Sequence, residues 1–163
     1  MFQDSRINKV LYGGDYNPEQ WPEEIWEEDM RLFKLAGIDE VTLNVFSWAA
    51  LQPSEDTYNF EKLDKIMDLV EANGLKVFLA TSTAAHPAWM AKRHPDILRT
   101  EFSGMKRKFG SRHNSCQNSP TYQKYSVLLA KKLAERYGER ECVIGWHICN
   151  EYGGECYCEN CEK

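Results

Sequence analysis

Several common features are absent from this 163-residue chain, and each absence narrows what the chain can do. No apolar run approaches the roughly 20 residues that a membrane helix needs, so we expect no association with a membrane. The opening residues, MFQDSRINKV, lack the apolar segment of a secretory signal, so we expect a cytoplasmic protein. The net charge of −5, with no basic stripe carrying interleaved aromatic residues, argues against a nucleic-acid partner.

Short apolar runs alternate along the chain with longer amphipathic segments. The apolar runs predict buried strands, and the amphipathic segments between them predict helices. Because the strands are continuous apolar runs, we expect both of their faces to be buried and the sheet to be parallel. The expected strands are residues 10–16, 40–48, 75–81 and 142–150, and the expected helices are residues 21–37, 60–74, 87–94 and 119–138.

This βα alternation fits an open doubly wound sheet or a (β/α)8 TIM barrel. The first turn, GGDYNPEQW, lacks the glycine fingerprint of a dinucleotide site. Polar and aromatic residues follow every expected strand, and barrels build their active sites on that face. A complete barrel needs about 250 residues. We therefore expect an α/β fold in which this chain supplies about the first four βα units of a TIM barrel.

An Asn-Glu pair, Asn150 and Glu151, ends the fourth apolar run. Burial of Glu151 beside Trp48 or Trp146 would raise its pKa, as a general acid requires. Asn150 could donate a hydrogen bond to a substrate hydroxyl. The alternative is a glutamate that merely ends a strand and faces water, and the residues alone leave both interpretations open.

Six cysteines in a chain with no expected export signal favour metal binding or core packing over disulfides. Three of them, Cys156, Cys158 and Cys161, form a C-x-C-x-x-C motif whose thiolates can occupy three corners of a zinc tetrahedron. Cys116 is the candidate fourth ligand, because its loop emerges from the same barrel face. The alternative is a group of free surface thiols. The remaining two cysteines are expected to pack as small core residues: Cys142 and Cys149.

Five motifs, in order along the chain, resemble the N-terminal half of a glycoside hydrolase family 42 β-galactosidase: GGDYNPEQW, NVFSWAALQPSE, TAAHPAWM, RHNSCQNSP and HICNEYG. The resemblance implies a retaining β-galactosidase in which Glu151 is the acid/base and Asn150 holds the 2-hydroxyl of the sugar. It implies that Arg112 binds galactose hydroxyls; the alternative is a solvated arginine in the basic loop 106–113. Three further residues are candidates for lining the pocket: Trp48, His86 and Trp89.

The same resemblance implies a homo-oligomer, often a trimer, and a structural zinc ion. The ligands of the zinc ion would be the four cysteines already named: Cys116, Cys156, Cys158 and Cys161. Residues 1–163 would be the N-terminal half of the catalytic barrel, ending in the zinc-binding segment. The family's nucleophile glutamate follows a seventh strand that this chain lacks, so we expect the chain alone to be inactive.

Two other functions remain open at this point. The first is a non-catalytic, zinc-stabilised half-barrel that binds sugar or associates with itself, because half a barrel exposes sheet edges. The second is another glycosidase, such as a glucanase or mannanase, which would share the Asn-Glu pair. That hypothesis would not predict the zinc-binding cysteines or the motif GGDYNPEQW near the start of the chain.

Overall fold

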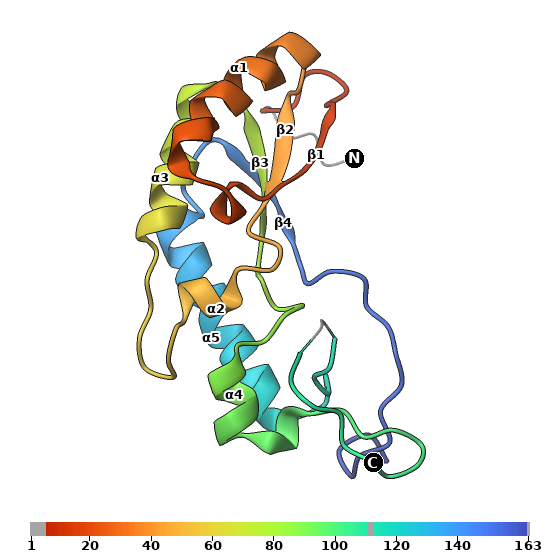
Figure 1. Ribbon diagram of the computed structural model, residues 1–163. Helices are drawn as coiled ribbons and strands as arrows, with labels where there is room; N and C mark the ends of the chain where they lie inside the picture. Colours follow the sequence, from red (N-terminus) through yellow and green to blue (C-terminus); the bar gives the residue numbers. More distant parts are fainter. Residues whose placement is uncertain (1–5, 111–112, 163) are drawn as a thin grey trace.

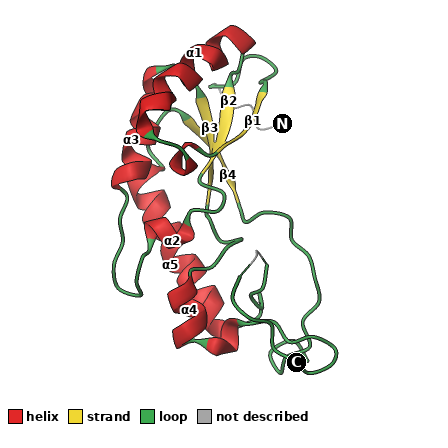
Figure 2. Ribbon diagram, in the orientation of Figure 1, coloured by secondary structure: helices red, strands yellow, loops and turns green. Residues whose placement is uncertain are grey.

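A computed structural model describes residues 6–110 and 113–162, and its centre is a four-stranded parallel sheet (Figures 1 and 2). The strands lie in the order β1-β2-β3-β4, so neighbours in the chain are neighbours in the sheet. Their bounds are β1 Gly13–Tyr16, β2 Glu40–Leu43, β3 Lys76–Ala80 and β4 Val143–His147. This sequential parallel order is that of consecutive strands in a (β/α)8 barrel.

The long helices α1, α3 and α5 lie together on one side of the sheet (Figure 2). A doubly wound sheet would carry helices on both faces, so this arrangement decides for half of a TIM barrel. The helices are α1 Trp26–Ala36, α2 Trp48–Leu51, α3 Glu61–Ala72, α4 Ala88–Arg93 and α5 Pro120–Tyr137. Three short 3-10 turns accompany them: η1 Pro18–Gln20, η2 Glu23–Ile25 and η3 Pro95–Ile97.

The hydrophobic core lies between the sheet and these helices. In β2, Val41 and Leu43 are buried while Glu40 and Thr42 are only half-buried, so one face of the strand packs against helices. The expectation that both faces are buried is therefore wrong within this chain. The expected apolar face of α3 is confirmed, because these four residues are all buried: Leu63, Ile66, Met67 and Val70.

Helix ends follow the local chemistry of the sequence. Gly37 ends α1 with a left-handed φ of 72°, a conformation that costs glycine little, and its N–H bonds to carbonyls of the last turn. At the start of α5, the Ser119 side chain accepts a hydrogen bond from the Tyr122 N–H, with Pro120 in the first turn. Both helix boundaries are as the sequence predicts.

The ends of the strands differ more from the predicted positions than the ends of the helices do. The strand expected at 40–48 stops at Leu43, because Asn44 takes a left-handed φ of 69°. Its side-chain amide donates to the Ala80 carbonyl at 3.1 Å, which fastens the turn to β3. Trp48 starts α2 instead of ending a strand, so the apolar run 45–48 enters the core as a turn and a short helix.

A polar cluster around Glu55 joins the loop between α2 and α3 to α4 and α5. The Glu55 carboxylate accepts hydrogen bonds from Arg93 at 2.6 Å, from the Tyr125 hydroxyl and, at 3.0 Å, from the ring of His94.

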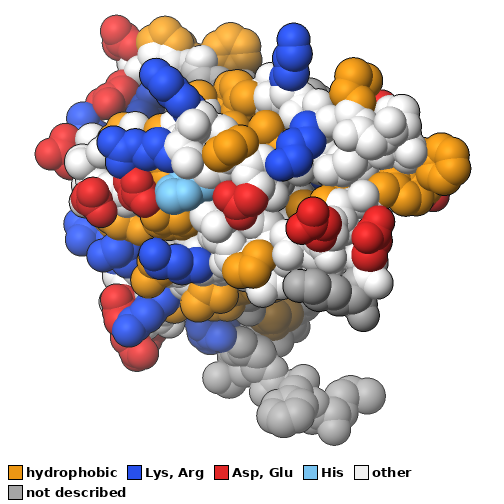
Figure 3. All heavy atoms as spheres, turned by 90° about the horizontal axis from the view of Figure 1, so that it is seen from below, with side chains coloured by type: hydrophobic (Ala, Val, Ile, Leu, Met, Phe, Trp, Pro, Cys, Tyr) orange, Lys and Arg blue, Asp and Glu red, His pale blue; other side chains and the backbone are white. Residues whose placement is uncertain are grey.

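The surface of the molecule carries interspersed acidic and basic side chains on the face seen from below (Figure 3). Within the described residues, no helix is both long and apolar enough to cross a membrane.

Candidate functional site

Polar residues at the carboxyl ends of β2 and β3 form an interlocked layer. The Ser82 hydroxyl donates to the carbonyl of Asn44, and both residues have left-handed backbones. The hydroxyls of Thr81 and Thr83 lie 3.0 Å apart. All of these side chains are buried, so the loops that leave this face are fixed by hydrogen bonds and not by apolar packing alone.

Asn150 and Glu151 lie just beyond the end of β4. The N–H of Cys149 donates to the Thr81 hydroxyl at 3.2 Å, which anchors the turn to the strand-end layer. Cys149 and Glu151 both have positive φ, 61° and 47°, so the chain turns sharply out of the sheet here (Figure 1). The Asn-Glu pair is therefore presented at the face where all four parallel strands end.

Of the two interpretations left open for Glu151, burial beside Trp48 or Trp146 is not seen in this chain, where Glu151 is exposed. Trp48 is fully buried, and its indole N–H donates to Gln52 at 2.8 Å. Trp146 packs, half-buried, against the same core. Both indoles are thus engaged in the core, while the chain after β4 turns away from it.

The structure describes two of the other residues expected in the pocket or at the substrate, His86 and Trp89. His86 is buried, and burial lowers the pKa of its imidazole to about 4, so the ring is neutral near pH 7. Its ring lies edge-on to Phe109 at 5.6 Å. Trp89 donates to the Gln52 carbonyl and packs edge-on against Tyr125, so it joins α4 to α5. Arg112 lies outside the described residues.

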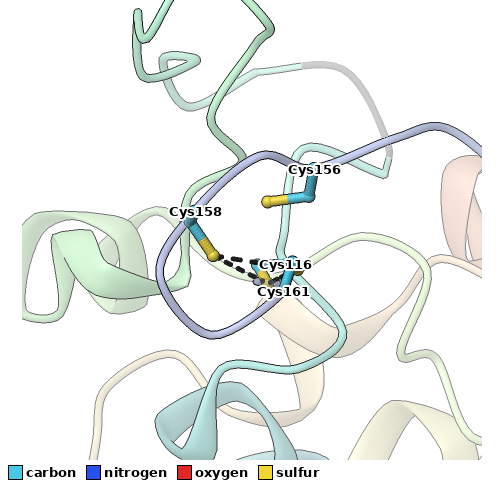
Figure 4. Close-up of side chains that lie close together, drawn as sticks. All are labelled: Cys116, Cys156, Cys158 and Cys161. Carbon is cyan, nitrogen blue, oxygen red and sulfur yellow. Dashed lines mark hydrogen bonds between the residues drawn. The ribbon is translucent and has the colours of Figure 1, made fainter. Parts of the chain in front are cut away.

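The four predicted cysteine ligands converge on one point (Figure 4). All four sulfurs lie within 4.8 Å of one another. The Cys116 sulfur is 3.5 Å from that of Cys158 and 3.4 Å from that of Cys161, and the latter two are 3.8 Å apart. Four sulfurs at about 2.3 Å from a tetrahedral zinc ion would be roughly 3.8 Å apart. The cluster is therefore close enough to hold a metal ion.

Main-chain and amide donors surround these sulfurs. The N–H of Thr100 points to the Cys156 sulfur at 3.4 Å, and the side-chain amide of Asn118 points to the Cys161 sulfur at 3.5 Å. Burial raises the pKa of the Cys116 thiol, and the neighbouring thiols raise it further. A cation at the centre would favour the thiolate form of all four ligands.

Cys142 and Cys149 lie outside this cluster and are both buried, as expected of small core residues. They flank β4 instead of lying within it. Burial raises the pKa of the Cys142 thiol to about 11, so this group is protonated and unreactive near neutral pH.

Sequence reasoning missed Arg99, a buried residue that joins the loop carrying Cys116 to the segment after Glu151. Its guanidinium donates to the carbonyls of Ser115 and Gly153. A lone arginine in a polar loop gives no sequence signal, because its partners are main-chain atoms of segments that are distant in the sequence.

Comparison with known proteins places these features in a family. Residues 15–163 match the family model described as beta-galactosidase, glycoside hydrolase family 42. Over 160 residues, 98% of this chain, the sequence is 64% identical to the beta-galactosidase BgaP of Planococcus sp. strain L4. It is 49% identical over 159 residues to the beta-galactosidase LacZ of Lactobacillus acidophilus.

Solved structures agree with this assignment. The crystal structure of a beta-galactosidase from Bacillus circulans sp. alkalophilus superposes with a TM-score of 0.94 over 96% of this chain, at 58% identity. A beta-galactosidase from Rahnella sp. R3 gives a TM-score of 0.93 at 42% identity. The chain covers 24% of the two curated relatives and 23% of the two solved chains, so it spans about a quarter of their length.

Proposed function

This chain belongs to glycoside hydrolase family 42, and from that premise we propose that residues 1–163 form the N-terminal half of the catalytic barrel of a retaining β-galactosidase. The reaction is the removal of terminal β-D-galactosyl residues from β-galactosides. The position of Asn150 and Glu151, directly after β4 at the face where the parallel strands end, carries this proposal. The names of the relatives supply the substrate class.

Glu151 is the proposed acid/base. In the first step its carboxyl group donates a proton to the glycosidic oxygen as the bond to the leaving group breaks. In the second step its carboxylate removes a proton from the water that releases the sugar. Asn150 donates a hydrogen bond to the 2-hydroxyl, and Arg112, which lies outside the described residues, is the proposed ligand of other galactose hydroxyls.

A retaining glycosidase needs a second carboxylate about 5–5.5 Å from the first, which attacks the sugar and forms a covalent intermediate. We assign this nucleophile to the part of the full-length enzyme that this chain does not span. The 163-residue chain alone is therefore predicted to be inactive, while the full-length enzyme, predicted to be a cytoplasmic homo-oligomer, is active.

We assign a structural zinc ion to Cys116, Cys156, Cys158 and Cys161. Four thiolates are a donor set that zinc prefers, and the separations among the sulfurs of Cys116, Cys158 and Cys161, 3.5, 3.4 and 3.8 Å, are close to the roughly 3.8 Å of a tetrahedron. Bound there, zinc would supply no chemistry to the reaction, because four protein ligands leave no open position. The cysteines themselves would hold the segment after Glu151 against the loop that carries Cys116.

A chimera tests the catalytic assignment. Residues 1–163 replace the matching quarter of the Planococcus β-galactosidase BgaP, whose 64% identity favours a compatible interface. The chimera should hydrolyse 4-nitrophenyl β-galactoside, and Glu151→Gln should lower kcat/KM on lactose by on the order of 100-fold or more. Glu139→Gln, which removes an exposed carboxylate before β4 at the opposite end of the sheet, is the control and should retain activity. Full activity in the Glu151 variant would overturn the assignment.

One observation favours the non-catalytic alternative. A hollow of about 380 Å³ separates α5 from the segment after β4, and its rim carries the exposed side chains of Val127, Ile148 and Tyr152. Such an apolar hollow could be covered by a second copy of the chain. Size-exclusion chromatography of the 163-residue chain tests this: a dimer combined with an inactive chimera would favour the alternative, and a monomer would remove its support.

A further inference from the structure

A buried arginine joins two segments that are distant in the sequence. Arg99 is 4% exposed. Its Nε donates to the Ser115 carbonyl at 2.9 Å, and its Nη2 donates to the Gly153 carbonyl at 2.6 Å. Among the described residues no carboxylate forms an ion pair with it. A buried cation that is satisfied by two main-chain carbonyls fixes the backbone that carries them.

Glycine at position 154 allows this approach. Gly154 has φ of 79°, and a Cβ there would lie 1.9 Å from Nη1 of Arg99. A larger residue would be strained in this conformation and would also collide with the guanidinium. The backbone of residues 153–154 is thus shaped around the Arg99 side chain.

The two joined segments lead to the two candidate functional groups. Ser115 immediately precedes Cys116, and Gly153 lies two residues beyond Glu151. Next to Arg99, the N–H of Thr100 points to the Cys156 sulfur, and the Thr100 carbonyl accepts from the Tyr157 N–H at 2.9 Å. Arg99 therefore attaches the segment at its catalytic end, and the four cysteines attach it at its other end.

We propose that Arg99 is a positioning residue for Glu151. By holding the main chain at Gly153, the guanidinium sets where the Glu151 carboxyl lies relative to the leaving group, and it does so separately from the metal. The inference rests on the proposed function of Glu151 as acid/base. The planar fork of arginine reaches two carbonyls in fixed directions, which the single ammonium of lysine cannot do.

The test uses the BgaP chimera and two substrates. Lactose needs protonation of its leaving group, whereas 2,4-dinitrophenyl β-galactoside has a leaving group acidic enough to depart without it. Arg99→Lys should lower kcat/KM on lactose by about 10- to 100-fold and on the dinitrophenyl substrate by less than about 3-fold. The zinc content should stay unchanged. Arg107→Lys is the control, because Arg107 lies exposed in the same loop and pairs with Glu101 at the surface; it should alter neither rate.

Gly154→Ala places a Cβ against Nη1 of Arg99 and so displaces the guanidinium without changing Arg99 itself. It should give the same selective loss on lactose, which keeps the test available if Arg99→Lys does not fold. An equal loss on both substrates would overturn the inference, because a merely structural role lowers every rate alike. Loss of zinc would also overturn it, since Arg99 would then act through the metal centre. If Glu151→Gln shows no preference between the substrates, the proposed function itself fails.

Discussion

The sheet-and-helix region and the cysteine region of this molecule are stabilised in different ways. The first region, β1–β4 with α1, α3 and α5, buries a continuous set of apolar side chains. The second, residues 98–110, 113–118 and 149–162, has exposed apolar side chains such as Phe102 and Met105, and its segments meet through main-chain hydrogen bonds and thiols. A barrel scaffold can therefore be built by burial, while the segment after Glu151 is attached by main-chain hydrogen bonds and by thiols that lie close enough to hold a metal ion.

The largest effect on stability should come from the core of the first region. Leu79 in β3 is fully buried, so Leu79→Ala should lower the free energy of unfolding by about 2–5 kcal/mol through lost burial and a cavity. Urea titration followed by circular dichroism measures this change. Leu35→Ala, on the exposed face of α1, is the control and should cost less than about 0.5 kcal/mol. Equal costs at both positions would contradict the proposed core.

The next largest effect should be a loss of zinc affinity, which concerns only the second region. Cys116→Ser removes one of the four sulfurs and should weaken zinc binding by the 163-residue chain by on the order of 100-fold or more. Competition with a chromogenic chelator measures the affinity. Cys142→Ala replaces a buried cysteine outside the cluster and should leave zinc binding unchanged. Unaltered zinc affinity in the Cys116 variant would refute the metal centre.

A smaller effect should appear at the polar cluster around Glu55, which joins the loop between α2 and α3 to α4 and α5. The Tyr125 hydroxyl, Arg93 and His94 lower the pKa of Glu55 from 4.5 to about 2. Because the pKa is lower in the folded state, the ionised carboxylate stabilises the fold above pH 4.5, and this contribution disappears as the pH falls toward 2. The urea midpoint should thus fall less steeply over this range in Glu55→Gln than in the unaltered chain.

Glu135→Gln is the matched control for that titration, because Glu135 is exposed and pairs with Lys131 only on the surface of α5. It should reproduce the slope of the unaltered chain. If Glu55→Gln and the unaltered chain lose stability with the same slope between pH 4.5 and 2, the cluster does not contribute as described.

Much of the first region follows from the sequence, because its signals are local. Apolar patterns predict the strands and the buried face of α3, and capping chemistry predicts Gly37 and Ser119 at helix ends. The sheet is parallel as predicted, although the burial of both strand faces, from which this was inferred, is not seen in this chain. The family resemblance, read from five motifs, is confirmed by the family match over residues 15–163, and with it the TIM barrel. The end of β2 was not predictable, because the apolar run continues past Asn44 while the backbone turns.

The second region is less predictable because its contacts join distant segments. The motif C-x-C-x-x-C predicts three ligands by spacing, and the structure brings Cys116 to them. The position of Arg99 could not be inferred, since its carbonyl partners carry no residue-type signal. The residues alone left open whether Glu151 is buried or faces water; it is exposed in this chain, because residues with positive φ direct the segment after β4 away from the core.

The most direct test of the account is azide rescue of the BgaP chimera carrying Glu151→Ala. With 2,4-dinitrophenyl β-galactoside as substrate, a covalent galactosyl-enzyme should form and then persist, because no base activates water. Added azide needs no base, so it should accelerate turnover and yield β-galactosyl azide, identified by NMR. No acceleration, or an α-configured azide, would contradict the assignment of Glu151 as the acid/base of a retaining enzyme.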